Sequence, residues 1–474
     1  MKDNLIKKIQ KEEKGSVTLF VLASCMFFLM ITLLININIV VKNDNQKKQI
    51  AQIIENYKVS AESLQEAYDN LYQETQIHVA LKNGTLCFYD NEKEAKQNAE
   101  QYYGNVKDEV YTRSWSTGPN TPWYGDRAQI KKVEFCTEIR PLNMACYFSD
   151  LSSLTEIAGL ENLHTDQVTS MKALFYNCTS LPTIDVSKFK TYQVTSMDAM
   201  FYNCASITNI IGLANLDTSK VTNMNSMFSN CKKLTTIDIS TFNLNNIEEM
   251  GYMFQTAENL QSIKFPENMD TRKLTFMREM FTNCSKLTKV DVSKFNTENV
   301  TDMKSLFRNC LSLSEIDVKN WNTSKVTDMG YMFCSCRSLT ELNVSNFNTQ
   351  NVTDMSFMFN ACEGLTELDV SNFNTPNVTN MESMFMSMHN TKTIIFSTNF
   401  KTDNVTTMYN MFGNSRALIS LDLSSFNTRK VTTMSQMFYD CRNLTKIYVG
   451  ANWQLAANTE SMFNGCGTST TTRK

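Results

Sequence analysis

The sequence predicts a repeat solenoid: a leucine-rich-repeat-like parallel β-solenoid with short helical or 3₁₀ turns, preceded by an N-terminal transmembrane helix and an amphipathic helix. Three observations predict it. One motif recurs every 26 or 27 residues over residues 168–457, an apolar run fills residues 16–41, and apolar residues follow heptad spacing over residues 50–71. A fixed period of about 20–50 residues is typical of solenoids, in which each unit buries its core only against its neighbours.

The composition and the absence of several sequence motifs argue against some classes of function. The 474 residues carry 45 Lys and Arg against 48 Asp and Glu, a formal net charge of −3. Because phosphate binding needs a basic face, we expect no nucleic acid as a partner. The chain has 3 His and contains no G-x-S-x-G, G-x-x-x-x-G-K-[ST], H-E-x-x-H or C-x-x-C motif. Since hydrolases, nucleotide-binding proteins and zinc sites commonly carry such motifs, we expect no enzyme, no cofactor and no metal site.

The first segments predict a membrane anchor. Residues 1–15 form a polar leader, and residues 16–41 are uncharged and mostly apolar. A bilayer core needs about 20 apolar residues in a helix, so this run is long enough to cross it. The leader carries five lysines: Lys2, Lys7, Lys8, Lys11 and Lys14. Because positive residues favour the cytoplasmic side, we expect a single-pass protein of the cell membrane, with a cytoplasmic leader and an extracellular repeat domain.

Two alternatives for the N-terminus stay open. Residues 22–25 (LASC) resemble a bacterial lipobox, in which the cysteine is lipidated after cleavage, although uncharged residues continue well beyond Cys25. A polar leader that ends at Gly15, followed by Ser16 and a long apolar segment, resembles a type IV prepilin, although Phe20 stands where pilins usually carry Glu. Gly15 and Ser16 are thus a candidate processing site. A pilin-like structural subunit that carries the array as its head is the alternative function.

Three segments separate the apolar run from the repeats. Residues 42–75 contain a heptad seam made of Ile50, Ile54, Tyr57, Ala61, Leu64, Tyr68 and Leu71. Such a seam favours either self-association through residues 50–71 or packing of this helix against the following domain. Residues 76–130 hold short mixed runs and a turn-rich stretch, which predict a small α+β connector. Residues 131–167 are expected to form an N-terminal cap with a degenerate repeat.

A typical unit, residues 352–377, reads VTDMSFMFNACEGLTELDVSNFNTPN, and eleven such units fill residues 168–457. Its M-x-x-M-F segment has the spacing of one helical face and predicts a short helix or 3₁₀ turn. The L-x-x-[IL]-x-V segment alternates as a strand does. Because stacked strands stand about 4.8 Å apart, the units would form a parallel sheet roughly 50 Å long, in a right-handed solenoid. Residues 458–474 hold a truncated repeat and the C-terminal tail.

Several columns of the repeat predict buried contacts, and the Met and Phe columns are expected to form the core. Cysteine recurs three residues after Phe, at Cys178, Cys204, Cys231, Cys284, Cys310, Cys336, Cys362, Cys441 and Cys466. Side chains of parallel units point alongside one another, so we expect unbridged, buried thiols. Threonine recurs three residues before the unit's first residue, at Thr165, Thr191, Thr218, Thr271, Thr297, Thr323, Thr349, Thr375, Thr402 and Thr428. Its hydroxyl is expected to satisfy backbone groups at the solenoid corners.

The repeat resembles that of a known family. The pattern F-N-T-x-x-V-T-x-M-x-x-M-F-x-x-C-x-x-L-T-x-L-D-V-S-x-F is similar to the repeat of BspA-like leucine-rich-repeat surface proteins of bacteria. Residues 121–124 (TPWY) and 148–151 (FSDL) resemble the segments that lead into the array in that family. The resemblance covers about residues 121–467 and implies extracellular display and binding of proteins or host surfaces. No cell-wall sorting motif follows Cys466, so attachment is expected through the N-terminal helix.

One polar column predicts a binding surface. An acidic residue stands between two strand core positions at Asp185, Asp238, Asp291, Asp317, Asp369 and Asp422, with Asn343 in the same column. Alternation places these side chains on the exposed face of the sheet. They form either a binding surface for a basic or hydroxyl-rich partner or for Ca²⁺, or a solvated face offset by cations such as Lys289 and Lys446. Our candidate partner-binding strip, called the predicted strip below, is Asp291, Asp317, Asn343, Asp369 and Ile395.

These observations together predict a bacterial cell-surface repeat protein for adhesion or protein–protein binding. The array is displayed from the membrane by the N-terminal helix, and the partner is an extracellular protein or a host or cell-surface ligand.

Overall fold

The computed structural model describes residues 52, 76–106, 109–114 and 117–474. The chain divides into two compact units, residues 1–76 and 77–474, and only the second is described below. The predicted leader and membrane span lie outside the described residues, as do the candidate processing site at Gly15 and Ser16 and nearly all of the heptad seam. Within the part of the chain that is described, no helix combines the length and the apolar character that membrane crossing requires.

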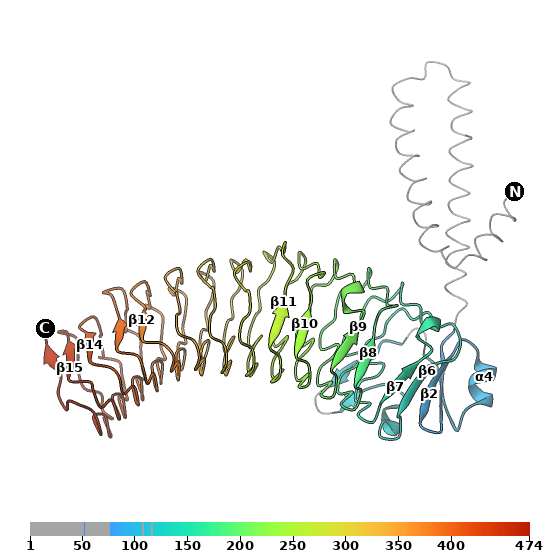
Figure 1. Ribbon diagram of the computed structural model, residues 1–474, viewed down its shortest axis with the longest axis horizontal. Coiled ribbons are helices and arrows are strands. Elements are labelled where there is room, and N and C mark those ends of the chain that lie inside the picture. Colours follow the sequence, from blue (N-terminus) through green and yellow to red (C-terminus); the bar gives the residue numbers. More distant parts are fainter. Residues whose placement is uncertain (1–51, 53–75, 107–108, 115–116) are drawn as a thin grey trace, which may run out of the picture. The chain divides into compact units, whose positions relative to one another are not determined.

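The second unit begins with a five-stranded sheet of order β3-β1-β2-β6-β7. Its strands are β1 (His78–Lys82), β2 (Thr85–Tyr89), β3 (Gln101–Asn105), β6 (Lys132–Phe135) and β7 (Glu156–Ala158). β1 pairs antiparallel with β2 and β3, whereas β6 lies parallel to both β2 and β7. Figure 1 shows this sheet at one end of the array. The sheet therefore joins the predicted connector to the first strand of the degenerate repeat.

Short elements complete this end of the unit. Helix α4 (Glu92–Gln97) begins after Asn91, whose side chain accepts the Glu94 amide at 2.8 Å and so caps the helix. Ala95 of α4 is buried against one face of the sheet. The remaining elements are the two-residue strands β4 (Arg113–Ser114) and β5 (Gly118–Pro119) and the 3₁₀ turns η1 (Tyr124–Asp126) and η2 (Leu160–Asn162).

The opposite face of the sheet continues into the core of the array. Phe88 of β2 contacts the rings of Trp123, Phe135 and Phe148, and Phe148 contacts Phe175 of the first regular unit. One hydrophobic core then runs without a break through the units to the last of them. The N-terminal sheet therefore covers the apolar end of the first unit, as a terminal cap of a solenoid must.

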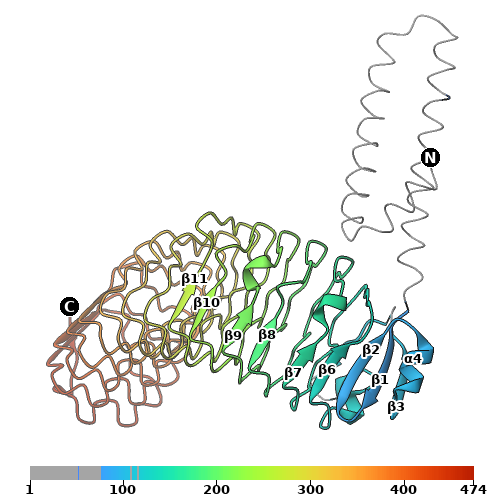
Figure 2. The same ribbon diagram turned by 45° about the vertical axis from the view of Figure 1, so that its right-hand side comes forward.

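The array is a parallel β-solenoid whose units follow one another in chain order (Figure 1, Figure 2). Its strands are β8 (Thr183–Asp185), β9 (Asn209–Ile211), β10 (Thr236–Asp238), β11 (Ser262–Lys264), β12 (Glu367–Asp369), β13 (Thr393–Ile395), β14 (Ser420–Leu423), β15 (Lys446–Val449) and β16 (Thr472–Arg473). Parallel pairing joins β8 to β9, β10 to β11, β12 to β13, and β15 to both β14 and β16. Asp369 of β12 is opposite Ile395 of β13. A further 3₁₀ turn, η3, spans Leu213–Asn215.

The prediction of one unbroken parallel sheet along the array is wrong. Among the described residues, β11 and β12 are separated by units whose strand segments share only the bridge from Lys289 to Glu315. Other parts of the repeat hold these units together, because a ladder of single bridges runs from Ser170 to Asn458 at one residue per unit. The strand segments are two to four residues long, so they supply few of the hydrogen bonds that fix the spacing of the units.

The prediction of a short helix or 3₁₀ turn at the M-x-x-M-F segment is also wrong. Ala173 and Asn177 of the first unit have φ of 52° and 62°, and the equivalent residues of the other units are left-handed as well. An α- or 3₁₀-helix needs negative φ throughout, whereas a type II β-turn requires positive φ at its third residue. The segment is a run of β-turns in which left-handed residues recur every four positions. The amides of Ala173, Phe175 and Asn177 donate to carbonyls of the next unit, which ties each turn to its neighbour.

The predicted burial of the Met, Phe and Cys columns is confirmed, except that Cys466 in the truncated repeat is half-buried. From Phe175 to Phe438 the rings of neighbouring units stack nearly parallel, with centroids 5.2 to 6.0 Å apart. Each central cysteine donates its thiol to the carbonyl of the Phe one unit earlier, as Cys362 does to Phe333 at 3.2 Å. Burial raises the pKa of Cys231 to about 12, so this thiol stays protonated.

Candidate functional site

The predicted strip lies where strand alternation places it. Asp291, Asp317, Asn343 and Asp369 are exposed, and each stands directly before a buried valine of the core. Asp369 belongs to β12, whereas the other three lie in units that form no regular strand. Ile395 of β13 lies beside Asp369 but is half-buried, so it offers less apolar surface to a partner than we expected.

A local hydrogen bond explains why Asp and Asn recur in this column. The side-chain oxygen of Asp369 accepts the amide of Ser371 at 2.8 Å, and Asn343 accepts the amide of Ser345 at 3.0 Å. Asp291 makes the same contact with Ser293 at 3.1 Å. This is the turn that Asx side chains form with the backbone two residues on. The column therefore has a structural role at the end of each strand segment, and the D-x-S spacing in the sequence was the signal for it.

The same turn leaves negative charge at the surface. In Asp291, hydrogen bonding by the Ser293 hydroxyl lowers the pKa of the carboxyl, so it stays ionised at neutral pH. A carboxylate has two oxygens, and the Asx turn uses one of them. The other oxygen stays available to a partner at the open face.

Ion pairs neutralise Asp317 in the predicted strip and Glu315 beside it, but not the carboxylates of the following units. Lys319 lies 3.1 Å from Asp317, and Lys289 lies 2.6 Å from Glu315. Within the described residues, no such ion pair reaches three exposed carboxylates in the following units: Glu341, Glu367 and Asp369. Glu341 and Glu367 stand two residues before Asn343 and Asp369, on the same face of the strand segments. These two glutamates are not among the residues predicted from the sequence for this face, although the recurring T-E-L triplet places them there.

A second polar column lies on the bridge ladder, directly before the first Met of each unit. Asp302, Asp328 and Asp354 are half-buried there, and the Lys304 ammonium lies 3.0 Å from Asp328 and 3.8 Å from Asp354. Arg278 pairs with Asp302 at 2.9 Å. Their charges are already paired within the array, so this column stabilises unit stacking and offers little unpaired charge to a partner.

A hollow of about 490 Å³ on the described surface lies elsewhere. It is lined by Ser240, Phe242, Lys264, Pro266 and neighbouring polar residues, where the unit around β11 departs from the regular repeat. It includes no residue of the predicted strip. The strip is a flat face of the array, which suits contact with an extended surface of another molecule better than enclosure of a small ligand.

The sequence matches one family model over most of the array. The model is described as "Mycoplasma protein of unknown function, DUF285", and it matches three overlapping stretches, residues 142–265, 260–367 and 353–473. No curated protein matches the chain.

Several solved structures are similar to the chain. A leucine-rich repeat protein from Eubacterium ventriosum is 15% identical over 84% of this chain and 95% of that one, with a TM-score of 0.33. A TLR13–ssRNA13 complex is 14% identical over 75% of this chain and 57% of that one, with a TM-score of 0.27. The Toll–Spätzle complex of Drosophila is 15% identical, with coverage of 73% and 50% and a TM-score of 0.24.

Proposed function

The chain belongs to the DUF285 family, and on that premise we propose that it is a bacterial cell-surface repeat protein that binds another protein through the strand face of its array. A solenoid presents extended regular faces whose exposed side chains can vary from unit to unit without changing the core. The buried Met, Phe, Cys and Thr columns leave the strand face free for this use.

The observation that carries the proposal is the unpaired acidic surface at Glu341, Glu367 and Asp369. Their like charges repel one another weakly in the free protein, and a partner with a basic surface would relieve that repulsion. Complementary charge raises the association rate and selects the partner, whereas affinity must also come from buried contacts. The partner we propose is therefore a protein with a Lys- or Arg-rich surface.

Surface display is the second part of the proposal. It rests on the apolar run of residues 16–41 and on the lysines that precede it. With this orientation the array is outside the cell, where an extracellular protein or a host-surface ligand can reach it, and adhesion is the role we propose for the contact. Self-association through residues 50–71 would display several arrays together and strengthen weak single contacts.

A pilin-like subunit is the second candidate, favoured by the leader that ends at Gly15 before a long apolar segment. Mass spectrometry of the protein isolated from its native membrane distinguishes the two. A mature N-terminus at Ser16 supports the pilin-like subunit, whereas an intact leader in the membrane fraction supports the plain anchor.

Charge reversal tests the binding face. In one variant Glu341→Lys, Glu367→Lys and Asp369→Lys are combined, and binding to a partner recovered from a screen of surface proteins is measured at two salt concentrations. We expect weaker binding and a smaller salt dependence, because the attractive charges are lost. The matched control combines Glu161→Lys, Asp403→Lys and Glu460→Lys, three exposed acidic residues outside the strip. Equal binding by both variants, with both folded, would move the site off this face.

A further inference from the structure

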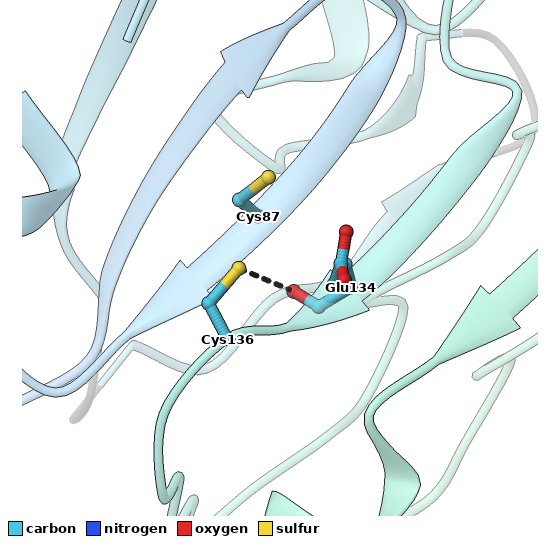
Figure 3. A group of neighbouring side chains, drawn as sticks. All are labelled: Cys87, Glu134 and Cys136. Carbon is cyan, nitrogen blue, oxygen red and sulfur yellow. Dashed lines mark hydrogen bonds between the residues drawn. The ribbon is translucent and has the colours of Figure 1, made fainter. Parts of the chain in front are cut away.

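Two cysteines and a glutamate come together in the N-terminal sheet, outside the proposed binding face. Cys87 lies on β2 and Glu134 on β6, where they are register partners, and Cys136 follows Glu134 by two residues. Because side chains alternate along a strand, all three project from the same face of the sheet. Figure 3 shows both thiols over that face. It is the face that α4 covers, so the thiols are at the edge of a small core that includes Tyr89 and Ala95.

The three side chains can converge on one ion. One ligand atom from each residue lies within 4.8 Å of the others. A tetrahedral Zn²⁺ with bonds of about 2.3 Å to sulfur holds two sulfurs about 3.8 Å apart. Rotation of the two cysteine side chains can bring the sulfurs to this separation from their present one, which is within 4.8 Å. The thiols are free to rotate because they make only long contacts of 3.7 and 3.8 Å to the carbonyls of Thr85 and Glu134.

Register argues against a disulfide as the purpose of this pair. Cys87 is opposite Glu134, and the Cys136 amide donates to Phe88, so the cysteines are diagonal neighbours. With strands about 4.8 Å apart and a rise of about 3.3 Å per residue, such diagonal neighbours have Cα atoms about 8 Å apart, whereas a disulfide requires about 4.4–6.8 Å. A metal ion inserted between the two sulfurs spans the longer separation without moving the backbone.

An ion pair orients the carboxylate of the cluster. Lys132 holds one oxygen of Glu134 at 3.1 Å and also contacts Glu156 at 3.5 Å, so it orients the glutamate and leaves its second oxygen available.

We propose that Cys87, Glu134 and Cys136 bind one thiophilic divalent cation, Zn²⁺, with water as the fourth ligand. Two thiolates and a carboxylate are ligands that zinc prefers. The ion would join β2 to β6, the seam where the antiparallel part of the sheet meets the parallel strands that lead into the array. The site is independent of the acidic face, and the proposal departs from the sequence-based expectation of no metal site.

Zinc binding by the full chain tests the proposal. The reduced protein is purified in detergent, freed of metal with a chelator, loaded with Zn²⁺ and passed through gel filtration. We expect about one zinc ion retained per chain, and thiolate-to-metal absorption when Co²⁺ replaces Zn²⁺. A chain that retains no zinc under reducing conditions would overturn the site.

Three variants assign the ligands. We expect Cys87→Ser and Cys136→Ser each to weaken zinc binding on the order of tenfold or more, and Glu134→Gln to weaken it less. The matched control is Cys466→Ser, which removes another half-buried thiol far along the chain and should leave binding unchanged. Equal losses in the control and in Cys136→Ser would contradict the assignment.

A measurement on the unaltered chain tests the zinc site even if a variant fails to fold. Alkylation of Cys136 by iodoacetamide, followed by peptide mass spectrometry, should slow when Zn²⁺ is present, whereas alkylation of Cys466 should not change. Equal alkylation of Cys136 with and without saturating Zn²⁺ would place the ion elsewhere.

Discussion

The hydroxyl of Thr349 holds the backbone of Asn374 in both directions. It donates to the Asn374 carbonyl at 2.8 Å and accepts the Asn374 amide at 2.9 Å, and the Thr349 side chain is fully buried. The same exchange joins Thr271 to the backbone of Asn296 and Thr402 to that of Asn427. Each of these three buried threonines therefore satisfies one donor and one acceptor of the next unit's corner, as the Thr column predicts.

Removing this hydroxyl should destabilise the array. Thr349→Val keeps the side-chain volume but leaves the part-buried amide and carbonyl of Asn374 without their partner, so we expect a loss of about 1 kcal/mol. Urea unfolding measures the loss, and hydrogen exchange of the Asn374 amide should speed up in the variant. Thr353→Val is the matched control, because the Thr353 hydroxyl is exposed and water can replace its bond to Thr327. Equal midpoints for both variants would contradict the role of the buried column.

The sequence predicts the contacts that repeat and misses those that do not. Phe359 and Thr349 were placed correctly, because each belongs to a column whose identity is fixed by contact with its own copies in neighbouring units. The M-x-x-M-F spacing was misread because consecutive turns with hydrogen bonds between residues three apart bring the same positions together as a helix does. Asn177, a residue that tolerates the left-handed conformation, was the available signal. Cys87 and Cys136 carried no signal, because only the pairing of β2 with β6 brings them together.

Truncating a residue of the Phe column should lower the free energy of unfolding more than truncating a residue of any other core column. Phe359 packs between Phe333 and Phe385, with ring centroids at 6.0 and 5.8 Å. We expect Phe359→Ala to cost about 3–5 kcal/mol, because it opens a cavity between two units. Phe357→Ala is the control, since this ring is half-buried and stacks on Tyr331 at the surface of the array. Thermal or urea unfolding that ranks the two variants equally would contradict the core assignment.

The thiols should separate into two reactivity classes. Without added metal, we expect Cys136 and Cys466 to react with an alkylating agent in the native protein, because they are half-buried. The buried Cys column should react slowly, since burial blocks access and raises the pKa of thiols such as Cys284 to about 12. Denaturation should make all described cysteines reactive. Rapid native-state alkylation of the Cys column, mapped by peptide mass spectrometry, would show that these thiols are not in the core.

Low pH should reduce the stability of the last regular unit, because Asp440 loses its negative charge there. Its carboxylate accepts hydrogen bonds from Arg442 at 2.7 Å and from Arg416 at 2.8 Å, and these two guanidiniums lower its pKa below the ordinary value. A lowered folded-state pKa adds stability above the unfolded pKa of about 3.9, and that stability disappears as the pH falls through the folded value. Asp440→Asn keeps the left-handed backbone that this position adopts but removes the charge.

We therefore expect the variant to be less stable than the parent protein at about pH 6 and the difference to shrink below about pH 4, as the parent carboxylate becomes protonated. The unfolding midpoints of both proteins across this pH range measure this difference in stability. Added salt provides the control, because the pair is near the surface and screening should reduce the difference at neutral pH. A difference that stays constant from neutral pH to the acid limit would mean that the Asp440 charge contributes nothing to the stability of the unit.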